Sequence, residues 1–469
     1  MRIESINPAT EEVVDTFESL DERGIAAALA CAESAGRRWP SVPMRDRRMM
    51  LERVALLLRG RKDRYAALMA EEMGKPVREG EAEAEKCAWV CDYYAQHAER
   101  LLAPEPADVS PGRAYVRFDP LGPVLAVMPW NFPFWQVFRF AAPALMAGNV
   151  VLLKHASNVP RCSLAIDALF LEAGLPDSVF QSLLIPSSAV AKVLENSVVR
   201  AATLTGSEAA GAEIASTAGR ALKKTVLELG GSDPFIVLDD ADIAKTAAWA
   251  ARARCINSGQ SCIAAKRFIV LEAIADRFVD AFRAEMDALV VGDPMDRATQ
   301  VGPLARLDLL ESVHAQVEAT VAAGARLVTG GRRVPRRGYF YAPTLLDAVT
   351  TGMAAADEEV FGPVAAVIRV RNDEEAVVLA NASRYGLGAS VWSRDPQRAE
   401  RLAPAIESGC VFVNDMVKSD PRLPFGGVKL SGYGRELSSY GIKEFVNVKT
   451  VWVRDEPPDA APRAQSPPE

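Results

Sequence analysis

The chain has 469 residues, of which 49% are hydrophobic and 25% are charged, and its formal net charge is −7. This length exceeds what one hydrophobic core organises, so we expect two or three domains. The acidic balance argues against a nucleic-acid partner, because neutralising phosphates requires a basic excess. The longest apolar stretch, residues 140–153, is interrupted by Pro143 and Gly148 and is too short to span a membrane.

The N-terminal residues contain no apolar segment of signal-peptide length, so a cytoplasmic location is expected. Seven scattered cysteines, an odd number, argue against a disulfide framework. Cys87 and Cys91 lie near His97, but no second pair of ligands stands at metal-binding spacing. We therefore expect these cysteines to pack a helix, and we expect no metal site.

The first hundred residues are predicted to be helical. Apolar residues recur at helical spacing in segments 21–39, 49–73 and 77–102, and the first of these begins with an acidic turn. The alternating glutamates of the third segment are expected to form a solvated, charged face: Glu79, Glu81, Glu83 and Glu85.

From residue 123 onward, short apolar strands alternate with helices, which predicts βαβ units and parallel sheets. In the first block the predicted strands are 124–127, 150–153, 179–185 and 198–205, and the predicted helices are 161–173 and 189–194. A second block runs from Phe235 to about Val413, with helices at 243–254, 273–289 and 307–323. The two blocks meet near Gly230 and Gly231, where glycine permits a sharp change of direction.

Two segments of the first block have features of a ligand site. The strand ending at Thr205 leads into Gly206 and Ser207, which open a helix whose N-terminal N–H groups favour an anion. Such a glycine also occurs for turn geometry alone, and the G-x-G-x-x-G fingerprint is absent. Lys154 follows a buried strand, so it is either a ribose or phosphate ligand or a solvated surface lysine.

Cys262, in the segment 257–262, and Glu228, in the segment 228–231, are a candidate nucleophile and a candidate base. A thiolate is both a strong nucleophile and a good leaving group, and a carboxylate within reach can take up a proton. Taken alone, Cys262 fits a buried structural thiol better, so only its combination with other residues indicates catalysis.

These two segments, together with residues 129–133, resemble the signature of the aldehyde dehydrogenase superfamily. Residues 359–363, 424–427 and 431–436 resemble further motifs of the family in the same order, so the resemblance covers about residues 3–453. It implies an α/β fold with two Rossmann-type parallel-sheet domains and a small β-hairpin that mediates oligomerisation. A homodimer or homotetramer is expected.

The resemblance also implies how the chain is divided into domains. Residues 1–103 and 121–230 would form the cofactor-binding domain, 231–427 the catalytic domain, 428–446 a return to the first domain, and 104–120 with 447–454 the oligomerisation strands. Residues 455–469, rich in Pro, Ala and acidic side chains, are predicted to be a disordered tail.

The family mechanism assigns each site residue a role. Cys262 would attack the aldehyde to form a thiohemiacetal, with the Asn131 side chain and the Cys262 backbone N–H holding the oxyanion. Hydride would pass to the nicotinamide, and Glu228 would activate the water that hydrolyses the resulting thioester. The residues assigned to the cofactor are Trp130, Lys154, Ser157, Gly206, Ser207, Glu359 and Phe361.

Ser157 bears on the choice between NAD and NADP. In the family, a glutamate three residues after the lysine suits the ribose of NAD, whereas a small hydroxyl residue leaves room for a 2′-phosphate. Because Ser157 stands three residues after Lys154, we expect NADP to be accepted, with NAD left open.

The substrate is expected to be a small aldehyde that carries a carboxylate. His155, Asn158 and the aromatics of residues 130–139 resemble a bacterial branch of succinate-semialdehyde dehydrogenases. Arg139, eight residues after Asn131, matches their carboxylate-binding arginine, whose guanidinium suits a bidentate contact. An ordinary ion pair is the alternative for Arg139.

Two further positions bear on this substrate assignment, and a third bears on redox regulation. Ser419 matches the serine that assists the arginine, but Ile256 stands where the family has a second substrate arginine. Ala264 replaces the second cysteine of the family's redox switch, so no such switch is expected.

The sequence thus predicts NAD(P)-dependent oxidation of succinate semialdehyde to succinate, with a broad-range aldehyde dehydrogenase as the alternative. A CoA-acylating enzyme would not need Glu228. A non-catalytic relative would be expected to lack Cys262, Glu228 or Asn131. A cofactor-free cysteine hydrolase would need a histidine, and none is near Cys262 in the sequence.

Overall fold

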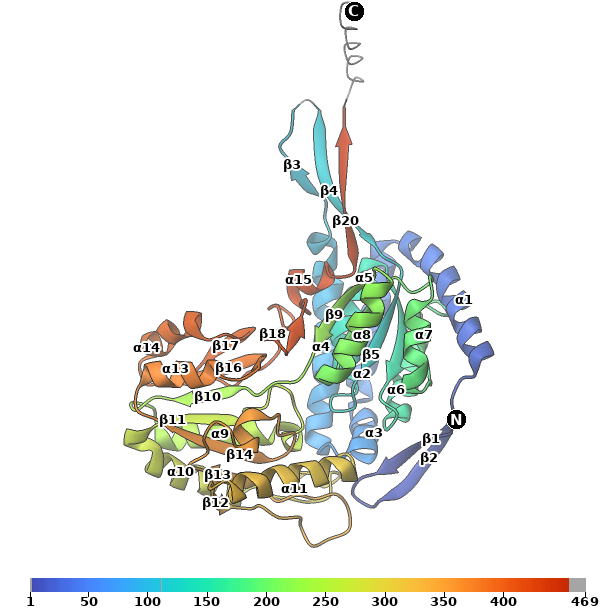
Figure 1. Cartoon of the computed structure of the whole chain (residues 1–469). Helices are drawn as coiled ribbons and strands as arrows, with labels where there is room; N and C mark the ends of the chain where they lie inside the picture. The colour runs from blue at the N-terminus through green and yellow to red at the C-terminus, as the bar shows by residue number, and fades with distance from the viewer. Residues whose placement is uncertain (1, 111, 455–469) are drawn as a thin grey trace, which may run out of the picture.

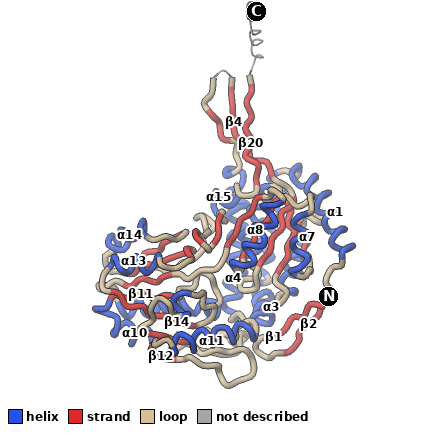
Figure 2. Tube along the Cα trace, in the orientation of Figure 1, coloured by secondary structure: helices blue, strands red, loops and turns tan. Residues whose placement is uncertain are grey.

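The structure, a computed structural model, describes residues 2–110 and 112–454. Two mainly parallel β-sheets form its centre, and a small antiparallel sheet projects from one side (Figure 1). Helices and loops surround both central sheets (Figure 2), which confirms the predicted α/β fold. The tail predicted at 455–469 lies outside the described residues.

The first central sheet has six strands in the order β19-β9-β8-β5-β6-β7. Its parallel strands are β5 (Pro123–Met128), β6 (Val150–His155), β7 (Phe180–Ser182), β8 (Ala201–Thr205) and β9 (Lys224–Glu228), and β19 (Gly432–Tyr433) pairs antiparallel with β9. The strands predicted at 179–185 and 198–205 are therefore shorter than expected. The helices between these strands are α5 (Trp135–Ala147), α6 (Pro160–Glu172), α7 (Val190–Glu195) and α8 (Glu208–Arg220).

The second central sheet has seven strands in the order β12-β13-β14-β11-β10-β16-β17, of which only the edge strand β12 is antiparallel. The strands are β10 (Pro234–Val237), β11 (Arg267–Leu271), β12 (Arg326–Thr329), β13 (Thr344–Asp347), β14 (Val364–Val370), β16 (Gly388–Trp392) and β17 (Cys410–Val413). Its helices are α9 (Ile243–Cys255), α10 (Glu272–Asp287), α11 (Leu307–Ala322), α12 (Ala354–Asp357), α13 (Asp373–Asn381) and α14 (Pro396–Leu402). A short helix α15 (Ser438–Ile442) and a two-stranded pair, β15 (Tyr385–Gly386) and β18 (Val428–Lys429), complete the C-terminal part.

The N-terminal part differs from the prediction in two places. An antiparallel hairpin, β1 (Arg2–Asn7) with β2 (Glu12–Glu18), precedes the helices, so the first hundred residues are not all helical. The helix predicted at 49–73 is two helices, α2 (Met44–Gly60) and α3 (Lys62–Met73), because the backbone leaves helical geometry at Arg61. Helix α1 (Glu22–Arg38) is as predicted, and the Asp21 side chain caps its N-terminus.

The third helix, α4 (Val77–Leu101), overturns the expectation of a solvated glutamate face. Glu81 and Glu85 do form ion pairs on the surface, with Arg297 and Arg59. Glu83, however, is buried, since it lies one turn from Gly80 and Cys87 on the apolar side of the helix. Alternate glutamates therefore face opposite sides of α4.

The projecting sheet has three antiparallel strands, β3 (Glu105–Ala107), β4 (Arg113–Pro120) and β20 (Val446–Val453). Strand β4 pairs with β20 along its full length, although the two strands are far apart in the sequence (Figure 1).

No helix in the described part of the chain has the length and apolarity needed to cross a bilayer. All seven cysteines are free, and Cys87 and Cys91 are buried in the core beside α2 and α5. Within residues 2–110 and 112–454, no three His, Cys, Asp or Glu side chains gather as metal ligands would.

Candidate active site

A cavity of about 360 Å³ contains Cys262, and much of its wall follows the carboxyl ends of parallel strands of the six-stranded sheet. Asn131 and Trp130 follow β5, Gly206 and Ser207 follow β8, and Leu229 and Gly230 follow β9. Ligand sites in open α/β folds lie at this edge of the sheet. Residues from the second sheet's part of the chain close the cavity: Cys262, Arg306, Leu309, Glu359 and Phe361.

The segment leading to Cys262 has an unusual backbone. Asn257, Ser258 and Gly259 are consecutive residues with positive φ angles of 54°, 57° and 77°. A side chain at Gly259 would begin 2.3 Å from the backbone of Gly362, so only glycine fits there. Two non-glycine residues in the left-handed region cost free energy, so the surrounding contacts must hold the turn in place.

Hydrogen bonds from several directions fix this turn. The Asn257 N–H donates to Glu79 Oε2 at 2.7 Å, and Asn257 Nδ2 donates to the carbonyl of Asn131 at 2.7 Å. The buried Lys266 ammonium donates to the carbonyl oxygens of Ser261, Cys262 and Ala264 at 3.0, 2.9 and 3.1 Å. The predicted nucleophile therefore lies in a loop whose carbonyl groups are turned toward a lysine.

The pKa of Cys262 is raised to about 12, because burial disfavours the thiolate. The positive charges of Arg139 and Lys266 act in the opposite direction and lower it. The thiol is therefore protonated at neutral pH in this structure, and it has to lose a proton before it can attack.

Asn131 lies beside the Cys262 turn. Its Nδ2 donates one hydrogen to the carbonyl of Gln260 at 3.1 Å, and the amide group has a second hydrogen. Only 4% of its surface is exposed, and both Asn131 and Cys262 line the same cavity. The second hydrogen is available for an oxyanion that forms next to Cys262.

Glu228, the last residue of β9, does not line this cavity. Its carboxyl group points toward Gly426, where an added Cβ would lie 2.7 Å from Glu228 Oε1. Both carboxyl oxygens are buried and have no hydrogen-bond partner in the structure. Burial raises the pKa of Glu228 well above its usual value, although the charge of Arg139 opposes this shift, so its surroundings favour the protonated form.

Lys154 and Ser157 lie at and just after the carboxyl end of β6, beside β5. Lys154 is buried and makes no ion pair with the described residues, and burial lowers its pKa. Ser157 is exposed. Neither side chain lines the Cys262 cavity. If Lys154 and Ser157 belong to the candidate site, that site extends beyond the cavity along the edge of the sheet.

His155, the last residue of β6, supports a neighbouring loop through hydrogen bonds. Its Nδ1 accepts the N–H of Ala156 at 2.9 Å, so Nε2 carries the proton and donates to the carbonyl of Pro133 at 2.8 Å. Burial lowers its pKa to about 4, so the ring is neutral at pH 7. This neutral ring supports the loop that carries Asn131.

Glu359, Phe361 and Trp130 meet on the cavity wall. The rings of Trp130 and Phe361 make an edge-to-face contact with centroids 5.8 Å apart. Glu359 Oε1 accepts the N–H of Gly231 at 3.0 Å and lies 3.7 Å from Lys266 Nζ, and burial raises the pKa of this carboxyl group. The three residues line the same cavity as Gly206 and Ser207.

Arg139 is fully enclosed in α5 and lines neither this cavity nor the one described below. It forms an ion pair with Glu436, lies 3.4 Å from the Thr205 hydroxyl, and stacks on Phe425 at 4.7 Å. The guanidinium is thus already paired with a carboxylate in this structure. Ser419 is also buried, and its hydroxyl accepts a hydrogen bond from Lys86 Nζ at 2.8 Å.

Sequence reasoning missed the supporting contribution of α4. Glu83 forms a buried ion pair with Lys75 and accepts the N–H groups of Phe134 and Trp135, both at 2.9 Å, which fixes the start of α5. Glu79, one turn earlier, holds Asn257. The spacing of Glu79, Glu83 and Lys86 at intervals of four and three residues was the available signal, because it places all three on one helix face.

The residues at the cavity fit a dinucleotide. Helix α8 has 13 residues, and the Ser207 hydroxyl caps it by accepting the Ala210 N–H, which leaves other first-turn N–H groups for a phosphate. Gly206 places no side chain over this helix start, and Lys154 supplies a cation without a counter-ion at the neighbouring strand end. Glu359, on the same cavity wall, has carboxylate oxygens of the kind that could accept a hydrogen bond from a ribose hydroxyl group.

The chain is similar to known proteins over nearly its whole length. The sequence model of the aldehyde dehydrogenase family matches residues 1–451, and the chain belongs to this family. It is 52% identical over 456 residues to succinate-semialdehyde dehydrogenase (NADP+) 1 of Mycobacterium tuberculosis, covering 97% of this chain and 100% of the relative. It is 51% identical over 457 residues to succinate-semialdehyde dehydrogenase (NADP+) of Mycobacterium avium, covering 97% of each chain.

Among solved structures, the chain is similar to succinic semialdehyde dehydrogenase from Streptococcus pyogenes in complex with NADP+. The TM-score is 0.95 at 39% sequence identity, and the match covers 97% of this chain and 100% of the other.

Proposed function

We propose that this aldehyde dehydrogenase oxidises succinate semialdehyde to succinate and uses NADP in preference to NAD. The observation that carries the proposal is the cavity in which Cys262, Asn131 and the start of α8 meet. The likeness to NADP-linked succinate-semialdehyde dehydrogenases over nearly the whole chain supports the substrate and the cofactor. The exposed Ser157 supports NADP, because no carboxylate at this position repels a 2′-phosphate.

In this proposal the Cys262 thiol first releases its proton to solvent water. Sγ then attacks the aldehyde carbon, the C=O π bond opens, and a thiohemiacetal oxyanion forms. Asn131 Nδ2 donates its second hydrogen to the oxyanion, together with the Cys262 backbone N–H. When bound, the nicotinamide accepts a hydride from the substrate. Gly206, Ser207, Lys154 and Ser157 bind the phosphates and ribose, and the remaining cofactor contacts come from Glu359, Phe361 and Trp130.

Glu228 has two requirements before it can activate water. Its carboxyl group has to turn from Gly426 toward Cys262, and it has to lose its proton, because burial holds its pKa high. A deprotonated Glu228 then takes a proton from the water that attacks the thioester on Cys262, and succinate leaves.

Arg139 and Ser419 are proposed to act on the substrate side. Arg139 supplies positive charge near Cys262, which favours both the thiolate and an anionic substrate. Ser419 offers a hydroxyl group to the substrate carboxylate.

We also propose a cytoplasmic homodimer or homotetramer, with residues 1–103, 121–230 and 428–446 binding the cofactor and 231–427 carrying the nucleophile. The projecting sheet β3-β4-β20 supports the assembly, because its edge strands leave backbone groups available for another copy. On β20, Val448 is 61% exposed. Sedimentation of the purified protein checks this: a monomer at micromolar concentration would contradict it.

The experiment that tests the function measures formation of reduced cofactor with succinate semialdehyde and with its methyl ester, each with NADP and with NAD. We expect a higher kcat/KM for the semialdehyde than for the neutral ester, and a higher kcat/KM for NADP than for NAD. Equal kcat/KM values for the two aldehydes would leave a broad-range aldehyde dehydrogenase. A requirement for CoA would indicate the acylating reaction instead.

A further inference from the structure

A second cavity, of about 500 Å³, lies between α4, α9 and α10. It shares the segment 131–136 with the Cys262 cavity: Phe132 and Trp135 line the second cavity, and Asn131 and Gln136 line the first. Ile256, six residues before Cys262, also lines the second cavity. The second cavity therefore adjoins both segments that carry the proposed chemistry.

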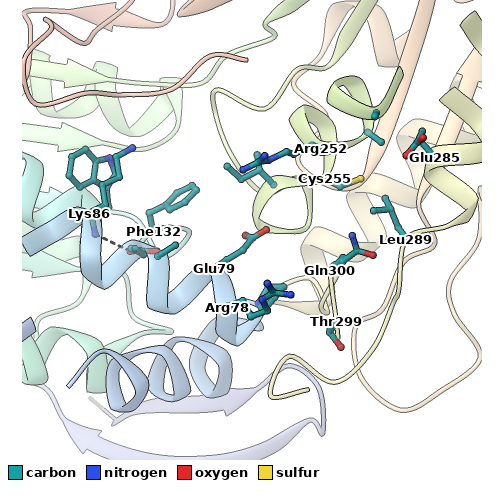
Figure 3. Close-up of a pocket in the computed structure, with 17 residues that line it drawn as sticks. Arg78, Glu79, Lys86, Phe132, Arg252, Cys255, Glu285, Leu289, Thr299 and Gln300 are labelled. Atoms are coloured by element: carbon teal, nitrogen blue, oxygen red, sulfur yellow. Dashed lines mark hydrogen bonds between the residues drawn. The ribbon is translucent and has the colours of Figure 1, made fainter. Parts of the chain in front are cut away.

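Lys86 is a cation at one end of this cavity. Figure 3 shows Lys86 and Phe132 at one end and Glu285 and Leu289 at the other. The Lys86 ammonium lies 4.4 Å from the Trp135 ring centroid and donates to the Ser419 hydroxyl. No carboxylate of the described residues lies within ion-pair distance of it.

The surroundings of Lys86 disfavour its charge. Burial, followed by the positive charge of Arg139, lowers its pKa to about 8, and Glu83, Cys87 and Asp420 act in the opposite direction. Arg139, by contrast, has its counter-ion in Glu436. Of the two neighbouring cations, Lys86 is the one that lines a cavity and lacks a counter-ion.

We propose that Lys86 is a specificity-determining residue that binds the substrate carboxylate, with the Ser419 hydroxyl as its partner. The inference rests on the proposed function, because it assumes a substrate with a carboxylate. The ammonium donates one hydrogen to Ser419 and keeps two for an anion, and the Ser419 O–H can donate to the same anion. Ile256 stands where the family has a second substrate arginine, so the positive charge of that arginine is absent here. Lys86 then supplies a positive charge in its place.

The test compares wild type with Lys86→Met, which keeps the length of the side chain, and Lys86→Arg, which keeps the charge. The quantity measured is the ratio of kcat/KM for succinate semialdehyde to kcat/KM for its methyl ester. We expect Lys86→Met to lower this ratio about tenfold to a hundredfold, as for loss of a charged hydrogen bond, and Lys86→Arg to keep it within about threefold. The control is Lys192→Met. It removes an exposed lysine of α7 that pairs with Glu22 of α1, and it should keep the wild-type ratio.

A pH profile supplies a readout that a structural role would not change. Because Lys86 loses its proton near pH 8, KM for the semialdehyde should rise between pH 7 and pH 9.5 in wild type and stay flat in Lys86→Arg. KM for the ester should not show this rise in either protein.

The outcomes separate the inference from the function. If wild type prefers the semialdehyde and Lys86→Met keeps that preference, the inference is wrong and the proposed function stands. A loss of preference in Lys86→Arg equal to that in Lys86→Met also overturns it, because charge would not be the cause. If wild type itself shows no preference, the proposed substrate is wrong and the inference falls with it. If Lys86→Met does not fold, Ser419→Ala decides: an unchanged ratio overturns the inference.

Discussion

The cavity that contains Cys262 and the cavity beside α4 share one wall, but different parts of the fold build them. The wall of the first consists largely of short loops that follow parallel strands, and four of these residues, Trp130, Asn131, Gly206 and Ser207, stand in two adjacent pairs in the sequence. Much of the second is lined by faces of α4, α9 and α10, so many of its residues recur three or four positions apart, as Glu79, Glu83 and Lys86 do.

This difference explains which residues a sequence motif can identify. A loop at a strand end places consecutive residues at one site, whereas a helix distributes a site over several turns among residues that face elsewhere. On α4, Glu79 and Glu83 support the catalytic loops while Glu81 and Glu85 form surface ion pairs. The predictions below separate the contributions of the two cavities.

The largest effect is expected from Cys262→Ala. Aldehyde oxidation should fall at least about a thousandfold, because no other nucleophile replaces the thiol. Binding of NADP, measured by fluorescence titration, should stay within about twofold of wild type. Cys31→Ala, on the exposed side of α1, is the control. Residual turnover near the wild-type value would remove Cys262 from the mechanism.

Glu228→Gln should lower turnover about a hundredfold by slowing hydrolysis of the thioester. Intact-protein mass spectrometry should detect the acyl group on the variant. Since the pKa of Glu228 is raised, the active carboxylate form increases with pH, so wild-type turnover should rise with pH. Glu228→Gln should lose this rise, and Glu213→Gln, an exposed change on α8, should keep it. A variant with wild-type turnover and no acyl adduct would contradict the role of Glu228.

Arg139→Met tests whether Arg139 or Lys86 is the cation that contacts the substrate. Removing this guanidinium leaves Glu436 buried without its partner, so the free energy of unfolding should fall by about 3–5 kcal/mol. The double variant Arg139→Met/Glu436→Gln should recover much of this loss in urea unfolding. If stability is unchanged and only KM for the semialdehyde rises, Arg139 contacts the substrate directly and Lys86 is the less important cation.

The smallest effect is expected from Ser157→Glu, which acts on the cofactor side alone. The new carboxylate should lower kcat/KM for NADP about tenfold relative to NAD, because it repels the 2′-phosphate. Ser157→Thr keeps the hydroxyl group and serves as the control. A preference for NADP that survives Ser157→Glu would mean that the 2′-phosphate does not lie near this side chain.

The sequence predicted the alternation of strands and helices well where apolar strands are short and continuous, as in β5 and β6. It missed the β1–β2 hairpin, because β2 is largely exposed and neither strand carries a continuous apolar run. It treated α2 and α3 as one helix, because no proline or clear cap marks the break at Arg61.

For the site, family motifs named the residues around Cys262, but not their orientation or charge state. The rotation of Glu228 toward Gly426 and the pairing of Arg139 with Glu436 depend on contacts between segments about 200 and 300 residues apart in the chain. The charge of Glu83 alone predicts a solvated side chain, whereas its neighbours Gly80 and Cys87 on the same helix face are buried. Burial of a charged residue depends on such partners, which composition does not reveal.

Lys266 offers a way to observe the catalytic loop chemically. Its side chain is buried, and each of its three hydrogens is donated to a carbonyl oxygen of the segment 261–264. An amine engaged in this way has no free lone pair, so acylating reagents should modify it only when the loop opens. The extent of acetylation at Lys266, relative to an exposed lysine such as Lys192, therefore measures how often the nucleophile's loop leaves its folded position.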